Sequence, residues 1–107
     1  MKLNPAISLS NRQSEIVSKI LAQRLDKIGE VKVYGSRATG HARPGSDLDL
    51  VIYPPISERD LTDLWTAFEE SDLPITVDLT VWDRIVSPRL REEILRDAVA
   101  VFEPSIV

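Results

Sequence analysis

Apolar residues recur along the chain with a helical period in three stretches. In residues 10–28 they are three or four positions apart, which predicts one amphipathic helix that opens with the capping box Ser10–Gln13 and ends at Gly29. A second helix is predicted from Ser57, its capping residue, to about position 73. A third begins at Ser87-Pro88, where a capping serine precedes a proline.

Between these stretches the pattern changes to strands. Residues 31–34 form a short apolar strand, residues 99–102 could form another, and Asp47–Tyr53 and Ile75–Trp82 alternate between two faces. One face of each longer strand is apolar, and the other carries aspartates. The element order predicts an α/β (α+β) fold, in which helices pack on the apolar face of a small mixed β-sheet and leave the aspartate face uncovered.

Length and composition narrow the functional classes. With 107 residues we expect a single domain, 1–107, with room for one core and one site. The net charge of −4 argues against a broad nucleic-acid surface, which needs a basic face. There are no cysteines, no signal-like N-terminus and no apolar run long enough to cross a bilayer, so we expect a cytoplasmic protein without a membrane association.

Three aspartates on the polar strand faces suggest a metal site. Asp47 and Asp49 are two positions apart, so on a strand they point the same way, and Asp78 lies on the polar face of the next long strand. Carboxylates this close repel each other unless a cation lies between them, and Mg²⁺ prefers such ligands together with substrate phosphates. We expect Asp47 and Asp49 to hold Mg²⁺, and Asp78 to help hold a second metal ion or act as general base.

A glycine-serine turn before the aspartates suggests a phosphate site. Gly35 and Ser36 follow the first strand, and such a turn offers backbone N–H groups and a hydroxyl to a polyphosphate. Arg37 and Ser46 complete the set of candidate nucleotide-binding residues. For Arg37 and for Arg43, the sequence leaves a phosphate contact and a solvated surface position equally open.

For three further side chains the sequence leaves more than one role open. His41, the sole histidine, is better interpreted as an exposed loop residue than as a catalytic base. Trp82 and Tyr53 share the predicted aspartate face, where stacking on a base, contact with a partner and ordinary packing are all open.

The motif as a whole resembles a known signature. Gly35-Ser36, ten intervening residues and Asp47-Leu48-Asp49 resemble the GSX10DXD signature of minimal nucleotidyltransferase (MNT) domains in the DNA polymerase β-like superfamily. The third carboxylate of that family, on a later strand, matches Asp78. The resemblance implies a polymerase β-like nucleotidyltransferase fold, an ATP donor, and a metal-binding and catalytic role for the three aspartates.

The resemblance also implies a partner. Small MNT proteins are commonly the antitoxins of HEPN/MNT toxin–antitoxin pairs, in which the antitoxin transfers AMP from ATP to a tyrosine of the HEPN ribonuclease toxin. The chain is too short for the acceptor-binding domain of larger relatives, so we expect the acceptor on another protein or in a pocket completed by oligomerisation. The alternatives are a small-molecule (aminoglycoside-type) nucleotidyltransferase and a non-catalytic antitoxin. Template-dependent polymerisation or tRNA tailing is disfavoured by the acidic balance.

Overall fold

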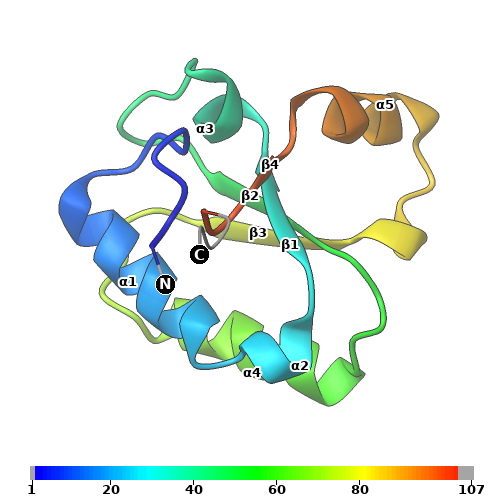
Figure 1. Cartoon of the computed structure of the whole chain (residues 1–107), viewed down its shortest axis with the longest axis horizontal. Coiled ribbons are helices and arrows are strands. Elements are labelled where there is room, and N and C mark those ends of the chain that lie inside the picture. The colour runs from blue at the N-terminus through cyan, green and yellow to red at the C-terminus, as the bar shows by residue number, and fades with distance from the viewer. Residues whose placement is uncertain (1, 104–107) are drawn as a thin grey trace.

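The computed structural model describes residues 2–103 and consists of one sheet with helices against it (Figure 1). Within those residues no helix is both long and apolar enough to cross a membrane. The elements along the chain are α1 (Asn11–Ala22), α2 (Leu25–Ile28), β1 (Val31–Tyr34), α3 (Ser36–Thr39), β2 (Leu48–Ile52), α4 (Glu58–Glu69), β3 (Val77–Val81), the 3-10 helix η1 (Trp82–Arg84), α5 (Pro88–Asp97) and β4 (Val99–Ala100).

The first predicted helix is divided into α1 and α2. Its capping box is present, since the Gln13 backbone N–H donates to Ser10 Oγ over 3.1 Å and the Ser10 N–H donates to Gln13 Oε1 over 2.9 Å. The division occurs near Arg24, whose guanidinium donates to the Ile20 carbonyl while its backbone N–H bonds the Leu21 carbonyl. In a continuous helix the Arg24 backbone N–H would bond the Ile20 carbonyl, and here the Arg24 side chain takes that place. The prediction of a single helix is therefore wrong at this point.

The four strands form a mixed sheet in the order β3-β2-β1-β4. Strand β1 is antiparallel to both β2 and β4, whereas β2 and β3 run parallel. The predicted mixed sheet is thus confirmed. The glycine-serine turn and Asp47 lie in the segment that joins the two central strands, β1 and β2, and Asp49 lies in β2 itself.

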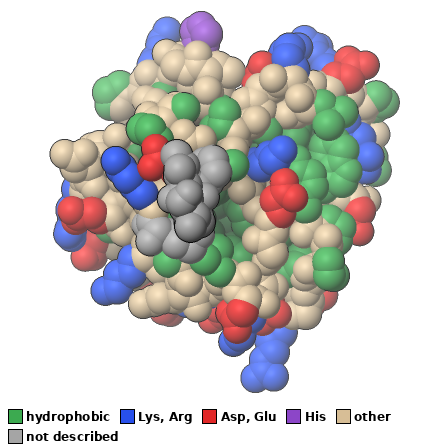
Figure 2. Space-filling model, viewed as in Figure 1, with side chains coloured by type: hydrophobic (Ala, Val, Ile, Leu, Met, Phe, Trp, Pro, Cys, Tyr) green, Lys and Arg blue, Asp and Glu red, His purple; other side chains and the backbone are tan. Residues whose placement is uncertain are grey.

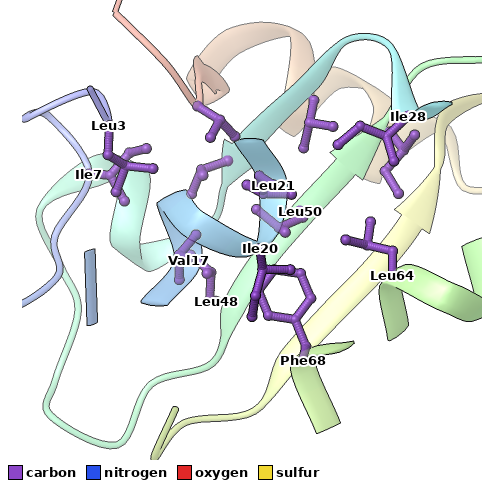
Figure 3. Close-up of a cluster of buried hydrophobic side chains, with 14 residues drawn as sticks. Leu3, Ile7, Val17, Ile20, Leu21, Ile28, Leu48, Leu50, Leu64 and Phe68 are labelled. Atoms are coloured by element: carbon purple, nitrogen blue, oxygen red, sulfur yellow. The ribbon is translucent and has the colours of Figure 1, made fainter. Parts of the chain in front are cut away.

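The main core lies between the sheet and the helices α1 and α4 (Figures 1 and 3). In Figure 3, Leu50 of β2 lies beside Leu21 of α1 and Leu48 lies beside Val17 of the same helix. The side chains of Leu48 and Leu50 are fully buried in this core together with Leu21 and with Leu64 of α4. Because alternate residues of a strand point to opposite faces, the neighbours of these leucines face away from this core. This core fixes which side of β2 is left for Asp49.

A second, smaller core on the other face of the sheet corrects the predicted layering. Val51 and Tyr34 point to this face and are buried with Ile94 of α5 and Ile85, which precedes it. Helix α5 therefore covers part of the face that we expected to be free of helices. On the face drawn in Figure 2, hydrophobic side chains gather beside α5, while charged side chains are scattered over the remainder. Only a part of the aspartate face is left open.

Candidate active site

Strand β1 leads directly into the glycine-serine turn. Gly35 follows Tyr34 with φ of +74° and ψ of −157°, a combination that is essentially restricted to glycine. A Cβ atom at Gly35 would also lie closer than 3.0 Å to Oδ2 of Asp49. The turn and the carboxylate are thus in direct contact, and both the backbone and this contact require glycine at position 35.

Helix α3 begins at Ser36, immediately after that turn. The N–H groups of Ala38 and Thr39 already donate to the Gly35 carbonyl, over 3.0 and 3.2 Å. Those of Ser36 and Arg37 precede the first hydrogen bond of the helix, so they are the ones that an outside acceptor could use. The Ser36 side chain is half-buried beside them. This part of the predicted phosphate site therefore has the donors that the sequence indicated.

Asp49 and Asp78 are brought together by the pairing of β2 with β3. In this parallel pair Asp49 lies directly opposite Asp78, and on the other side of β2 Tyr34 lies opposite Asp49. Residues in register point to the same face of a sheet, so the two carboxylates are neighbours. Asp49 is half-buried and Asp78 is exposed.

Asp47 differs from the prediction because it lies outside the strand. Strand β2 begins at Leu48, whose backbone N–H donates to the Thr76 carbonyl over 2.9 Å, and Asp47 belongs to the preceding loop. Its side chain is exposed. The position of Asp47 therefore depends on the conformation of that loop and is not set by the ladder of strand hydrogen bonds that holds Asp49.

Burial and the neighbouring carboxylates both raise the pKa of Asp49. Its pKa is raised from 3.8 to about 6, first because burial disfavours the charged form and then because Asp78, Asp47 and Glu93 add negative charge nearby. Glu93, on α5, was missed by the sequence reasoning. The sequence carried no signal for it, because only the packing of α5 on this face of the sheet brings Glu93 to the site.

Tyr34 borders the same group of acids. Its hydroxyl and that of Thr80 lie 3.4 Å apart. Burial, together with the charges of Asp49 and Asp78 and despite the contact with Thr80, raises the pKa of the Tyr34 phenol. Tyr34 is therefore neutral at physiological pH and adds no further charge to the site.

These residues could hold Mg²⁺ if a bound nucleotide supplied the remaining ligands. In residues 2–103 no group of three or more His, Cys, Asp or Glu side chains is arranged to hold a metal ion alone. Mg²⁺, however, is usually bound by one or two carboxylates together with substrate phosphates and water. The adjacent Asp49 and Asp78 supply such a pair. Burial first, and neighbouring carboxylates second, raise the pKa of Asp49, and a bound cation would favour its charged form.

Arg37 does not lie where a phosphate could reach it. Its side chain is only 4% exposed, and each of its three guanidinium nitrogens donates to backbone carbonyls. Its acceptors are the carbonyls of Ser8, Arg43, Pro44 and Ser46. The expectation that Arg37 binds the nucleotide is corrected: the side chain holds the protein's own backbone.

Ser46, the other predicted nucleotide-binding residue, forms hydrogen bonds within its own loop. Its Oγ accepts from the Arg43 backbone N–H over 2.9 Å, and its own N–H donates to the Arg43 carbonyl over 3.0 Å. Arg43 itself is exposed. His41 is exposed too, with Nδ1 3.0 Å from Thr39 Oγ1, in line with the prediction of a loop residue.

The aromatic side chains near this face contact other residues of the chain. The Trp82 and Tyr53 rings lie 5.7 Å apart between centroids, and the Arg91 guanidinium lies 4.7 Å from the Trp82 centroid. The sequence predicted that Trp82 ends the third strand, but Trp82 instead begins η1. These contacts favour packing over base stacking for both rings.

Comparisons with known proteins agree with this arrangement. The sequence matches the nucleotidyltransferase domain family over residues 14–101. A curated relative from Haemophilus influenzae, "Probable protein adenylyltransferase MntA", is 38% identical over 102 residues, which are 91% of this chain and 85% of that protein. A solved structure given as a minimal nucleotidyltransferase is 36% identical, with a TM-score of 0.56 over 82% of this chain and 87% of the other.

A further solved structure is alike in fold. A toxin–antitoxin crystal structure with AMP-PNP aligns with a TM-score of 0.62 at 18% identity, over 84% of this chain and 73% of that one.

The matched region contains every residue on which the site was built. Residues 14–101 include the Gly35 turn, Asp49 and Asp78, and the relatives cover most of this chain and most of their own length. The family that the sequence signature suggested is therefore confirmed. This chain belongs to the nucleotidyltransferase domain family, in its minimal form.

Proposed function

We propose that this protein is a Mg²⁺-dependent adenylyltransferase that transfers AMP from ATP to a tyrosine hydroxyl of a HEPN ribonuclease toxin and thereby acts as its antitoxin. The observation that carries the chemical part of the proposal is the register of Asp49 with Asp78 beside the Gly35-Ser36 turn. It places two carboxylates next to the first N–H groups of α3, an arrangement suited to a metal-bound triphosphate.

The proposed reaction is a single displacement at phosphorus. The acceptor oxygen attacks the α-phosphorus of ATP, the bond from that phosphorus to the oxygen bridging to the β-phosphate breaks, and pyrophosphate leaves. Ser36 and the N–H groups of the turn position the phosphates. Mg²⁺, held by Asp49 with Asp47 or Asp78, would neutralise the triphosphate charge. Asp78 would help to hold a second metal ion or would receive the acceptor proton, and its exposed side chain on the edge strand β3 leaves it accessible for either role.

The proposed acceptor rests on the relatives. The Haemophilus influenzae relative, at 38% identity, is named as a protein adenylyltransferase. The toxin–antitoxin structure with AMP-PNP has the same fold as this chain and contains a nucleotide analogue. The name of the first relative supports a protein as the acceptor in preference to a small molecule, and the toxin–antitoxin complex is the basis for proposing that this protein is a toxin.

The test requires the partner protein. A suitable candidate would be a small helical protein that is encoded beside this chain and carries an Arg-x4-6-His motif. The two proteins are incubated with ATP and Mg²⁺, and the toxin is examined by intact mass and by peptide mass spectrometry for added AMP. We expect AMP on a tyrosine of the toxin, together with loss of its ribonuclease activity.

Variants of this chain separate the competing functions. Asp49→Asn removes one of the paired carboxylates and should abolish transfer, whereas Asp72→Asn, an exposed aspartate paired only with Arg12 at 3.8 Å, should leave it unchanged. Neutralisation of the toxin by Asp49→Asn at the wild-type level, without added AMP, would instead establish an antitoxin that acts by binding. AMP transfer to an aminoglycoside but not to the toxin would establish the small-molecule alternative.

A further inference from the structure

Arg37 is the sole charged side chain that is buried among residues 2–103. No carboxylate lies within ion-pair distance of its guanidinium in that part of the chain. Its charge is instead surrounded by carbonyl oxygens, with donor–acceptor distances from 2.7 to 3.4 Å. A buried cation without an acidic partner is costly unless its donors are all well placed, so the position of this side chain is strongly determined.

The guanidinium connects three segments that are separate in the sequence. Arg37 belongs to α3, directly after Ser36 of the proposed phosphate site. Its Nη1 donates to the Ser8 carbonyl over 2.7 Å, and the Ser8 N–H donates back to the Arg37 carbonyl over 2.8 Å. Its Nε and Nη2 both donate to the Ser46 carbonyl, over 3.0 and 2.8 Å. The segment before α1 and the loop before β2 are thus bonded to the same side chain.

The bonds to Ser46 matter because Asp47 is the next residue. Asp49 and Asp78 are held by the pairing of β2 with β3, but Asp47 precedes the strand and has no such support. The peptide group that joins Ser46 to Asp47 carries the carbonyl that accepts both guanidinium bonds. Because two donors of one rigid guanidinium converge on this single oxygen, they restrain the peptide group that leads to Asp47.

From these contacts we propose that Arg37 is a positioning residue, which holds loop 43–46, and through it Asp47, in the geometry that nucleotidyl transfer requires. The proposal rests on the proposed function for its catalytic consequence and on the hydrogen bonds alone for its structural one. Lysine cannot replace arginine here, because an ammonium group is a point donor and cannot bond Ser8 and Ser46 from one rigid plane.

The test compares Arg37→Lys with wild type in two independent measurements. Amide hydrogen exchange of the nucleotide-free protein, read by mass spectrometry, reports on the loop without any activity. We expect exchange in residues 43–47 to become at least tenfold faster while α4 and β3 keep their protection. Steady-state transfer to the toxin should show kcat lowered about 100-fold, the effect of a misplacement of about 1 Å, with the KM for ATP changed less than threefold.

Arg24→Lys is the matched control. Arg24 also donates to a backbone carbonyl, that of Ile20 over 3.0 Å, and it pairs with Asp63 over 2.7 Å, but it lies between α1 and α2. This variant should leave both the exchange of residues 43–47 and the transfer rate unchanged.

Several results would overturn the proposal. Wild-type exchange and kcat in Arg37→Lys would exclude positioning, and so would faster exchange spread evenly over the whole chain, which indicates a general loss of stability. A raised KM for ATP at unchanged kcat would identify Arg37 as a phosphate contact instead. If wild type transfers no AMP, the proposed function fails, while the exchange measurement still decides whether Arg37 holds the loop.

A measurement on the wild-type protein covers the case in which Arg37→Lys does not fold. In a nitrogen-15 NMR spectrum, the Arg37 Nε–H should exchange with water at least 100-fold more slowly than that of the exposed Arg12. Equal exchange rates would contradict the buried contacts and with them the proposal.

Discussion

Substituting alanine for Gly35 tests the closest contact in the site. The backbone at Gly35 has φ of +74° and ψ of −157°, a region in which a non-glycine residue costs about 1–3 kcal/mol. The new methyl group would in addition meet Asp49 Oδ2 at less than 3.0 Å and its Cγ at 3.4 Å. Gly35→Ala therefore strains the turn and displaces the carboxylate.

The two effects have separate magnitudes. For a domain of this size each kcal/mol lowers the melting temperature by roughly 4–8 °C, so a strain of about 1–3 kcal/mol should lower it by about 4–24 °C. The Asp49 carboxylate must withdraw by about 1 Å to restore an ordinary contact, and a displacement of that size reduces the rate of transfer about 100-fold. We expect both changes in Gly35→Ala, measured by thermal unfolding and by AMP transfer to the toxin.

Gly40→Ala is the control that separates strain from displacement. Gly40 also has a positive φ, of +81°, but a Cβ atom there has nothing within 4 Å. This variant should lose about 1 kcal/mol of stability and keep its transfer rate. If Gly35→Ala and Gly40→Ala retain the same transfer rate, the contact between Gly35 and Asp49 has no role in catalysis and the reasoning is refuted.

Three further predictions concern charge, core and capping. The pKa of Asp49 is about 6 in the folded protein against an ordinary 3.8, so the folded state binds this proton more tightly. The resulting loss of stability grows between about pH 4 and pH 6 and is complete above pH 6. Asp49→Asn should thus stabilise the metal-free protein at pH 8 by about 1–2 kcal/mol after allowance for solvent screening, and the gain should vanish near pH 4 in urea titrations. Leu50→Ala, at a fully buried position, should cost about 2–5 kcal/mol in the same assay, whereas Leu95→Ala, 73% exposed, should change stability by less than about 0.5 kcal/mol. Ser57→Ala should cost about 1 kcal/mol because Ser57 Oγ accepts from the Asp60 N–H over 3.0 Å at the start of α4; no loss on calorimetry would contradict this role.

Much of the local structure was predictable because it depends on residues close together in the chain. The cap at Ser57, the serine-proline start of α5 and the end of α2 at Gly29 each involve contacts over a few positions, and all are present. The alternation of β2 likewise predicted that Leu50 would be buried and that Asp49 would face the other way. The spacing from Ser36 to Asp47 was sufficient to identify the family.

The local predictions that failed concern where elements begin and end. The helix predicted over residues 10–28 is divided at Arg24, which donates to Ile20 while pairing with Asp63 of α4. Strand β2 begins one residue later than predicted, which leaves Asp47 in a loop. Neither event has a signal in the periodicity, because periodicity records burial and not the partner of each polar group.

By itself, the sequence therefore determined the elements, the family and the three aspartates as candidates. Only the tertiary structure decided how these parts meet: the register of Asp49 with Asp78, the packing of α5 that brings Glu93 to the site, and the burial of Arg37. The physical reason is the range of the interactions. Caps and alternation are set by neighbours in the chain, whereas strand pairing and the burial of a charge depend on segments distant in sequence, here Ser8 and Ser46 around one guanidinium.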